Sequence, residues 1–310
     1  MDCSRCDAQA VYKRPYSGES LCRKHFLLSV ERQVRRTISK YGMFRRADKI
    51  AIAVSGGKDS LSLMHILRLI ERDFPTGLSV ITVDEGVSGY RDEAIGIVEK
   101  NCKSLGIELK TVAFRDVFRW DVDEIVETTQ EAHGELGPCS FCGVLRRKAL
   151  NAAAREIGAT KLVTGHNLDD EVQTMLLNLV HGDIFRSARV EPLTKAIHPK
   201  FVPRVKPLCE TPESEITLYA YLSGFEFQSV RCPHAGFALR NNIRDFVNKL
   251  ELDHPSVKFT IFRTFEKLRP LLKSSVQAQL KSCRVCGEPT ISDICEPCSM
   301  LHRIEALGKV

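Results

Sequence analysis

The stretch Ser55-Gly56-Gly57-Lys58-Asp59-Ser60 constrains the fold more than any other part of the chain, because it joins an apolar β-type run to a helical pattern. Two glycines allow a tight turn whose successive N–H groups face an anion. The start of the helix adds the positive end of its dipole, and Lys58 adds a full charge. The spacing is not that of a Walker A loop. We therefore expect a phosphate-binding strand–turn–helix unit.

Strand-like apolar runs alternate with helical patterns through the middle of the chain. The strand-like runs cover 50–54, 78–83, 108–114 and 161–164, and the helical patterns cover 59–73, 90–105, 143–158 and 169–180. Strands and helices alternating at these lengths form right-handed βαβ units. We therefore predict an α/β fold with a doubly wound parallel sheet. Further helical patterns lie at 26–41, 213–223 and 237–251, and four prolines between 192 and 207 predict an irregular stretch.

The loop as a whole resembles the PP-loop of ATP pyrophosphatases, and a second segment supports an ATP site. Gly165-His-Asn-Leu-Asp-Asp-Glu171 follows the fourth strand, and the carboxyl ends of parallel strands share one ligand-binding edge. Its acids suit Mg²⁺ beside a triphosphate, although acids at a helix start also favour the dipole without any ligand. The predicted ATP-binding residues are Ala53, Ser55, Gly56, Gly57, Lys58, Asp59, Ser60, Val83, Asp84, Gly165 and Asp170.

Twelve cysteines indicate metal binding, because ten of them fall into closely spaced sets. Two sets have the paired spacing of closed tetrahedral zinc sites. We predict one Zn²⁺ at each end of the chain, the first held by Cys3, Cys6, Cys22 and His25, and the second by Cys283, Cys286, Cys295 and Cys298. Cys102 and Cys209 stand alone and are expected to be buried apolar residues.

A third set, Cys139, Cys142 and the distant Cys232, has one thiol too few for a complete shell. Three thiolates suit a 4Fe-4S cluster with one iron open to a small ligand. The alternatives are a third zinc ion completed by His234, and a redox pair that carries a persulfide. The spacing alone leaves all three open.

Charge and hydropathy restrict the class of partner. The formal net charge is +6, and the basic residues gather in 1–48 and 255–284 around a slightly acidic centre. This distribution favours a polyanion bound by the ends of the chain. No apolar run approaches the length of a membrane span, and the first residues are not those of a signal peptide. We therefore expect no membrane contact and a cytoplasmic location.

Together these motifs resemble the tRNA 2-thiouridine synthetases of the TtcA/TtuA superfamily across nearly the whole chain. The stretch from Cys139 to Leu150, that from Val83 to Asp92, and that from Gly165 to Asp183 resemble the wobble-uridine (NcsA-type) branch. The branch that modifies position 54 of the T-loop has a lysine where this chain has Arg146. Arginine keeps the charge but not the ability to deprotonate, so a lysine role is not transferred.

The resemblance implies ATP-dependent 2-thiolation of the wobble uridine at tRNA position 34. The C2 oxygen attacks the α-phosphate of ATP, and sulfur then replaces AMP at C2, transferred through the iron–sulfur cluster or from a persulfide. The residues implied in catalysis are Cys139, Cys142, Cys232, Asp59, Asp170 and Arg146. The cofactors and substrates are ATP, Mg²⁺, a 4Fe-4S cluster, two Zn²⁺ and tRNA. The sulfur donor is sulfide or a ubiquitin-like thiocarboxylate carrier, and the family also implies a homodimer.

These features divide the chain into five expected units. They are a zinc knuckle at 1–27, a basic linker helix at 28–46, a PP-loop domain with the iron–sulfur site at 47–254, a basic tRNA-binding helical segment at 255–281, and a second knuckle at 282–310. The predicted tRNA contacts include both knuckles, the linker arginines and Lys258, Arg263, Lys267, Arg269, Lys273, Lys281 and Arg284. The alternatives are the same chemistry at T-loop position 54, another PP-loop tRNA-modifying ligase, and a non-enzymatic zinc-knuckle RNA-binding module.

Overall fold

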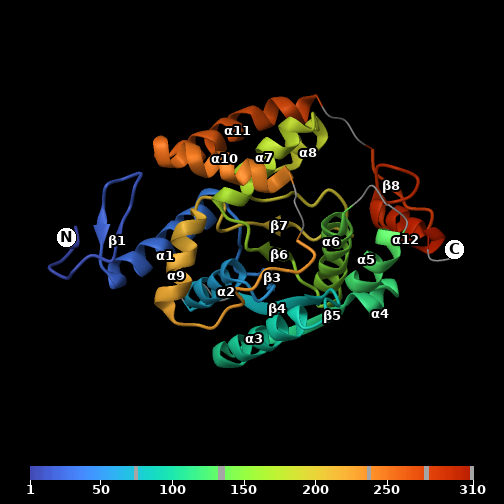
Figure 1. The fold of residues 1–310 in the computed structure, drawn as a ribbon, viewed down its shortest axis with the longest axis horizontal. Helices are drawn as coiled ribbons and strands as arrows, with labels where there is room; N and C mark the ends of the chain where they lie inside the picture. Colours follow the sequence, from blue (N-terminus) through green and yellow to red (C-terminus); the bar gives the residue numbers. More distant parts are fainter. Residues whose placement is uncertain (73–75, 132–136, 236–238, 276–278, 308–310) are drawn as a thin grey trace.

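The computed structural model describes residues 1–72, 76–131, 137–235, 239–275 and 279–307 (Figure 1). At its centre lies a five-stranded parallel sheet in the order β5-β4-β3-β6-β7. The strands are β3 (Lys49–Ala53), β4 (Gly77–Asp84), β5 (Glu108–Ala113), β6 (Lys161–Thr164) and β7 (Arg204–Val205). This confirms the predicted parallel α/β sheet.

Helices cover both faces of the sheet (Figure 1). Successive side chains of a strand point to opposite faces, so Ile50 and Ile52 of β3 pack into the largest core, whereas Ala51 faces a smaller one. The small alanine leaves room for helix α6, whose Ala153 and Ala154 pack there. The helices are α1 (Arg23–Lys40), α2 (Lys58–Glu71), α3 (Tyr90–Leu105), α4 (Phe114–Phe118), α5 (Val122–Glu131), α6 (Pro138–Glu156), α7 (Leu168–Val180), α8 (Ile184–Arg189), α9 (Glu213–Ser223), α10 (Leu239–Asp253), α11 (Val257–Ser274) and α12 (Glu296–Leu307).

The two cysteine-rich ends of the chain lie at opposite ends of the molecule (Figure 1). The first contains the hairpin β1 (Tyr12–Lys13) and β2 (Ser20–Leu21), and the second contains β8 (Lys281–Ser282) and β9 (Pro289–Thr290). Arg14 of the first binds Glu215 of α9 in a buried ion pair. Met300 and Ile304 of α12 pack into the core that α5 and α6 share. Each end is therefore held on the central domain.

The structure differs from the sequence-based prediction where elements are short. β7 lies inside the proline-rich stretch that was expected to be irregular, and α4, α5 and α8 had no predicted counterpart. The strand expected to end at residue 114 ends at 113, since Phe114 begins α4. The predicted positions 73, 237 and 238 lie outside the described residues. No helix in the described ranges is long and apolar enough to cross a bilayer.

Candidate functional site

The predicted phosphate loop connects β3 to α2 at the carboxyl edge of the sheet. Gly56 has a φ of +91°, and a Cβ there would lie 2.9 Å from the Ala94 carbonyl oxygen, so only glycine fits. Gly57 precedes the first turn of α2 as its N-cap. The Ser60 hydroxyl accepts from the Ser55 N–H at 3.1 Å and donates to the Gly57 carbonyl at 3.0 Å. These bonds hold the loop in a tight turn.

The second predicted segment lies beside this loop, as expected. The Asn167 side-chain amide donates to the Asp59 carboxylate at 3.0 Å. A Cβ on Gly165 would lie 3.0 Å from the backbone nitrogen of Ser60, so glycine permits the close approach. Asn167 is also the N-cap of α7, where its side-chain oxygen accepts from the Asp170 N–H.

The three acids of the second segment have different surroundings. Asp169 is buried against Lys258, and Glu171 accepts two bonds from Lys206 at 2.7 and 2.8 Å. Both are therefore structural ion pairs. Burial raises the pKa of the Asp170 carboxyl to about 6, against the opposing charge of Arg240. Of these acids, Asp170 is the one suited to a Mg²⁺ ion.

Lys58 is held by two carboxylates at the mouth of the loop. Its ammonium lies 2.8 Å from Asp59 and 2.8 Å from Glu213, the first residue of α9. Burial would lower the pKa of Lys58, but Asp59 and Glu213 reverse this and raise it. Lys58 is therefore charged and available to a phosphate. Glu213 was not predicted, since nothing in the sequence joins α9 to the loop.

The strand ends predicted to contact adenine lie at the same edge. The Val83 carbonyl accepts from the Arg91 guanidinium at 2.5 Å, and the Asp84 carboxylate accepts from the Gly86 N–H at 2.9 Å. Ala53 ends β3 next to them. The sequence did not predict the Arg91 contact. The adenine contact at Val83 stays a prediction, and adenine would share the Val83 carbonyl oxygen with Arg91.

The cysteines of the third set lie near the residues that follow β4, since Arg146 of α6 contacts Glu85 there. Cys139 and Cys142 occupy the first turns of α6, and Cys142 and Cys232 pack against the same core. The Cys139 thiol donates to the His234 carbonyl at 3.7 Å. Burial raises the pKa of the Cys142 thiol, whereas the Arg146 guanidinium, 2.9 Å away, opposes the rise. Three thiols and a cation that favours thiolate suit the ligand shell of a 4Fe-4S cluster.

The distances at this site do not favour a third zinc ion completed by His234. Cys139, Cys142, Cys232 and His234 do not form a group with all ligand atoms within 4.8 Å, whereas the two terminal sets do. The Nε2 atom of His234 lies 2.6 Å from the Asp123 carboxylate, and this contact fixes the ring. The zinc alternative with His234 therefore stays a prediction, one that these distances do not favour.

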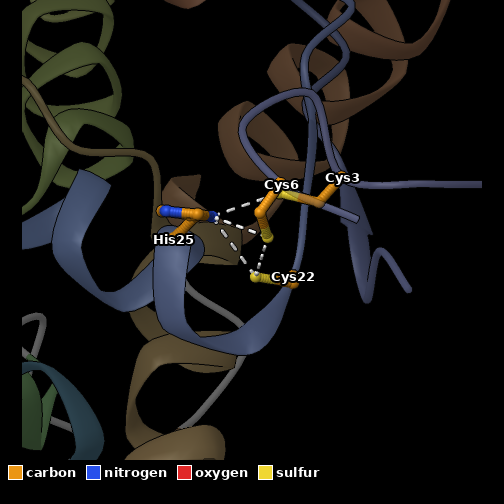
Figure 2. Close-up of side chains that lie close together, drawn as sticks. All are labelled: Cys3, Cys6, Cys22 and His25. Carbon is orange, nitrogen blue, oxygen red and sulfur yellow. Dashed lines mark hydrogen bonds between the residues drawn. The ribbon is translucent and has the colours of Figure 1, made fainter. Parts of the chain in front are cut away.

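The two terminal cysteine sets have the geometry of tetrahedral zinc sites. A zinc ion with Zn–S near 2.3 Å and Zn–N near 2.0 Å keeps its ligands about 3.5 to 3.8 Å apart. Figure 2 shows the N-terminal set, in which Cys3, Cys6 and Cys22 lie 3.3, 3.4 and 3.5 Å from Nδ1 of His25. In the C-terminal set, the sulfurs of Cys286 and Cys295 are 3.6 Å apart. The residues present therefore fit a zinc ion at each end.

The cationic side chains that RNA can reach are only partly the ones predicted from the sequence. A polar cavity of about 220 Å³ lies between the N-terminal knuckle and α1. Arg5, Arg32 and Arg36 line it, together with Arg14, which is held by its buried ion pair with Glu215 and is not available to RNA. Lys258, predicted to contact tRNA, is buried against Asp169 and cannot do so.

A second cationic group, not predicted, surrounds His166. Desolvation and then Lys206, Arg204, Arg240 and Arg147 lower the pKa of this imidazole to about 3, so it is neutral at physiological pH. Arg147 and Arg204 are exposed, and neither has an acid within ion-pair distance among the described residues.

Comparison with known proteins gives consistent matches along the whole chain. The model of the PP-loop domain matches residues 27–251, and that of the N-terminal LIM domain of the 2-thiouridine synthetase TtuA matches residues 2–27. The tRNA 2-thiolation protein NcsA of Haloferax volcanii is 37% identical over 99% of this chain and 100% of its own. The cytoplasmic tRNA 2-thiolation protein 1 of Dictyostelium discoideum is 36% identical over 99% of this chain and 85% of its own.

A solved structure is similar over the same length. The U34-tRNA thiolase NcsA from Methanococcus maripaludis, with its 4Fe-4S cluster, superposes with a TM-score of 0.83 at 34% identity. The match covers 98% of this chain and 96% of that chain.

Proposed function

This chain belongs to the TtuA/NcsA-type 2-thiouridine synthetases and is a tRNA sulfurtransferase, and from that premise we propose that it converts the wobble uridine at tRNA position 34 to 2-thiouridine. The similarity to the U34-tRNA thiolase NcsA supports position 34, and one structural observation supports the thiolation chemistry. The nucleotide loop and the three-cysteine site are joined by side chains: Arg91 contacts Ser55, Arg146 contacts Cys142, and both arginines contact Glu85, which follows β4. The two halves of the reaction, activation by ATP and delivery of sulfur, need such adjacency.

The first step is adenylation of the uridine by ATP. The C2 oxygen forms a bond to the α-phosphorus, the bond from that phosphorus to the β-phosphate oxygen breaks, and pyrophosphate leaves. Lys58 turns from Asp59 and Glu213 to the phosphates, and the loop N–H groups stabilise the charge that develops there. Asp59 and Asp170 would hold Mg²⁺, which would supply positive charge against the phosphates.

The second step replaces AMP by sulfur. A bond forms between sulfur and C2, and the bond from C2 to the oxygen that now belongs to AMP breaks. Cys139, Cys142 and Cys232 would hold a 4Fe-4S cluster, which would supply the nucleophilic sulfur. Arg146 lies beside Cys142 and orients the reacting groups through its fixed charge. Arginine does not deprotonate, so it cannot act as a base.

The tRNA is held by phosphate contacts on both sides of this edge. We assign these contacts to the arginine-lined cavity beside α1 and to Arg147 and Arg204 near His166. Such contacts position the RNA without reading its sequence, and they weaken as salt rises. The wobble base lies in a single-stranded loop and is therefore accessible to the site.

The remaining expectations belong to the same proposal. We place the reaction in the cytoplasm, with sulfide or a ubiquitin-like thiocarboxylate carrier as donor, and we expect a homodimer. The boundaries at residues 27, 46, 254 and 281 stay our proposed division of the chain.

The decisive experiment maps the thiolated nucleotide. Anaerobically purified chain is incubated with ATP, a sulfur source and a tRNA transcript, and digests are analysed by mass spectrometry. Transcripts with cytidine at position 34 or at position 54 identify the target. We expect one AMP and one pyrophosphate per 2-thiouridine, and product lost only when position 34 is changed.

Other outcomes assign the alternatives. Product that depends on position 54 would place the chemistry in the T-loop. AMP formation without sulfur in the RNA would indicate another PP-loop ligase, and binding of tRNA without AMP would indicate an RNA-binding module. Full activity of iron-free protein would favour the persulfide route over the cluster.

A further inference from the structure

A buried carboxylate, Glu85, lies between two arginines just after β4. The side chain is 5% exposed, and its Oε2 lies 2.7 Å from Nε of Arg91 while its Oε1 lies 2.5 Å from Nε of Arg146. The first contact is an ion pair without hydrogen-bond alignment. A carboxylate this deep is stable only when cations compensate its lost hydration. Glu85 therefore fixes both guanidinium groups with respect to each other.

Arg91 carries this constraint to the nucleotide loop. Its Nη1 donates to the Ser55 carbonyl at 2.7 Å, and its Nη2 donates to the Val83 carbonyl at 2.5 Å. A trans peptide is planar, with its C=O and N–H on opposite sides. The contact with the Ser55 oxygen therefore turns the Gly56 N–H away from Arg91. The direction of one N–H group of the loop thus depends on the Arg91 guanidinium.

Arg146 carries the same constraint to the three-cysteine site. Its Nη2 donates to the Cys142 sulfur at 2.9 Å, one helical turn away on α6. The Arg146 side chain is 45% exposed, so packing alone does not fix its several rotamers. Its described polar contacts are those with Glu85 and Cys142. Arg146 is thus held beside the sulfur by Glu85.

We propose that Glu85 is a positioning residue that couples the nucleotide loop to the sulfur site, through the chain of contacts Ser55–Arg91–Glu85–Arg146–Cys142. The inference rests on the proposed function, since it assumes that ATP binds at this loop. A nucleotide that tightens the loop holds Arg91 and, through Glu85, holds Arg146 on Cys142. Coupling of this kind is reciprocal, so a change at Arg146 alters nucleotide affinity.

The test measures the affinity of a non-hydrolysable ATP analogue for the cluster-free protein by calorimetry. Four chains form a double-mutant cycle: unmodified, Arg146→Met, Glu85→Gln, and both together. We expect Arg146→Met to weaken binding by at least about three-fold in the unmodified chain and to have no effect once Glu85 is changed. Glu156→Gln, which removes an exposed ion pair with Lys110 at the far end of α6, is the matched control and leaves affinity unchanged.

An equal effect of Arg146→Met in both backgrounds overturns the proposal, because Arg146 would then act without Glu85. A second measurement needs no variant of a buried residue. Saturating analogue should change the alkylation rate of Cys142 by at least about three-fold while that of the exposed Cys139 stays unchanged. Equal changes at both cysteines would overturn the coupling. Neither readout requires turnover or tRNA, so the wobble assignment can fail while the coupling holds, or the reverse.

Discussion

The side-chain amide of Asn167 donates to the carboxylate of Asp59 across 3.0 Å, and this bond joins the two segments of the nucleotide site. The same residue caps α7, because its side-chain oxygen accepts from the Asp170 N–H at 3.0 Å. One side chain therefore begins a helix and sets the separation of the two segments. Its two polar atoms have separate tasks, so they can be tested separately.

Replacing Asn167 by Asp should weaken nucleotide binding but keep the fold. Aspartate caps a helix as well as asparagine does, but it cannot donate to Asp59 and adds a like charge beside it. We expect the affinity for an ATP analogue to fall by at least about ten-fold, with the melting temperature shifted by no more than about 4 °C. The control Asp183→Asn makes the reverse exchange at the N-cap of α8. Unchanged affinity in Asn167→Asp would refute a role for this contact.

Asp170 should make Mg²⁺-dependent nucleotide binding sensitive to pH. Its pKa is raised to about 6 by burial, so the carboxylate is charged above pH 6 and neutral below it. Mg²⁺ requires the charged form, and its contribution to affinity should fall by up to about ten-fold per pH unit below 6. Calorimetry with and without Mg²⁺ at pH 5 and 7.5 measures this. Asp170→Asn is the control, because the phosphates of the analogue titrate in the same way with either protein. If the pH dependence of the Mg²⁺ effect survives in that variant, it does not come from Asp170.

The buried pair between Arg14 and Glu215 should dominate the attachment of the N-terminal knuckle. Glu215 has a side-chain exposure of 1% and accepts from Arg14 at 2.8 and 2.9 Å. Arg14→Met leaves that carboxylate buried without its cation, which should cost about 3–5 kcal/mol in the free energy of unfolding. Arg5→Met, which removes an exposed pair with Glu19, should cost at most about 1 kcal/mol. Urea unfolding of both variants checks the ranking, and equal losses would contradict it.

Cys22→Ser should remove one of two zinc ions. The four ligand atoms of the N-terminal set already have tetrahedral separations, and the loss of one thiolate opens that shell. Elemental analysis should show zinc falling from two ions per chain to one. Cys102→Ala, at a buried cysteine outside every set, should keep both. Two zinc ions retained in Cys22→Ser would show that this set binds none.

Three strands of the sheet were predictable because each has a clear sequence pattern. Residues 50–53, 78–83 and 161–164 are apolar, β-rich and separated by helical patterns of regular length, and each became a strand. The two-residue strand β7 was not predictable, because so short a strand between prolines is recognised only by its pairing with β6. The short α8 lacks the length from which a helical period can be read.

The site was predictable to the extent that its residues are neighbours in sequence. The loop, the Asn167 segment and the terminal cysteine sets have local spacing rules. Partners from distant segments follow no such spacing rule. Nothing in the sequence indicates that Glu213 forms an ion pair with Lys58, or that Glu85 forms one with Arg146. Lys258 shows the same limit, since its charge in a basic stretch indicated RNA, whereas the fold buries it on Asp169.

His234→Ala should separate the roles of the loop that carries Cys232. The imidazole binds Asp123, whose other oxygen accepts from the Ser88 N–H at 2.9 Å, so His234 anchors this loop to α5 and to the loop after β4. Because the imidazole is used as an anchor, its loss should leave zinc at two ions per chain. Iron incorporated by anaerobic reconstitution should fall only in part, whereas Cys232→Ala should abolish it, since a thiolate ligand is then missing. Elemental analysis and the visible spectrum of the two variants provide the measurement. A drop in zinc in His234→Ala would restore this histidine as a metal ligand, and equal iron loss in both variants would mean that the anchor matters as much as the thiolate.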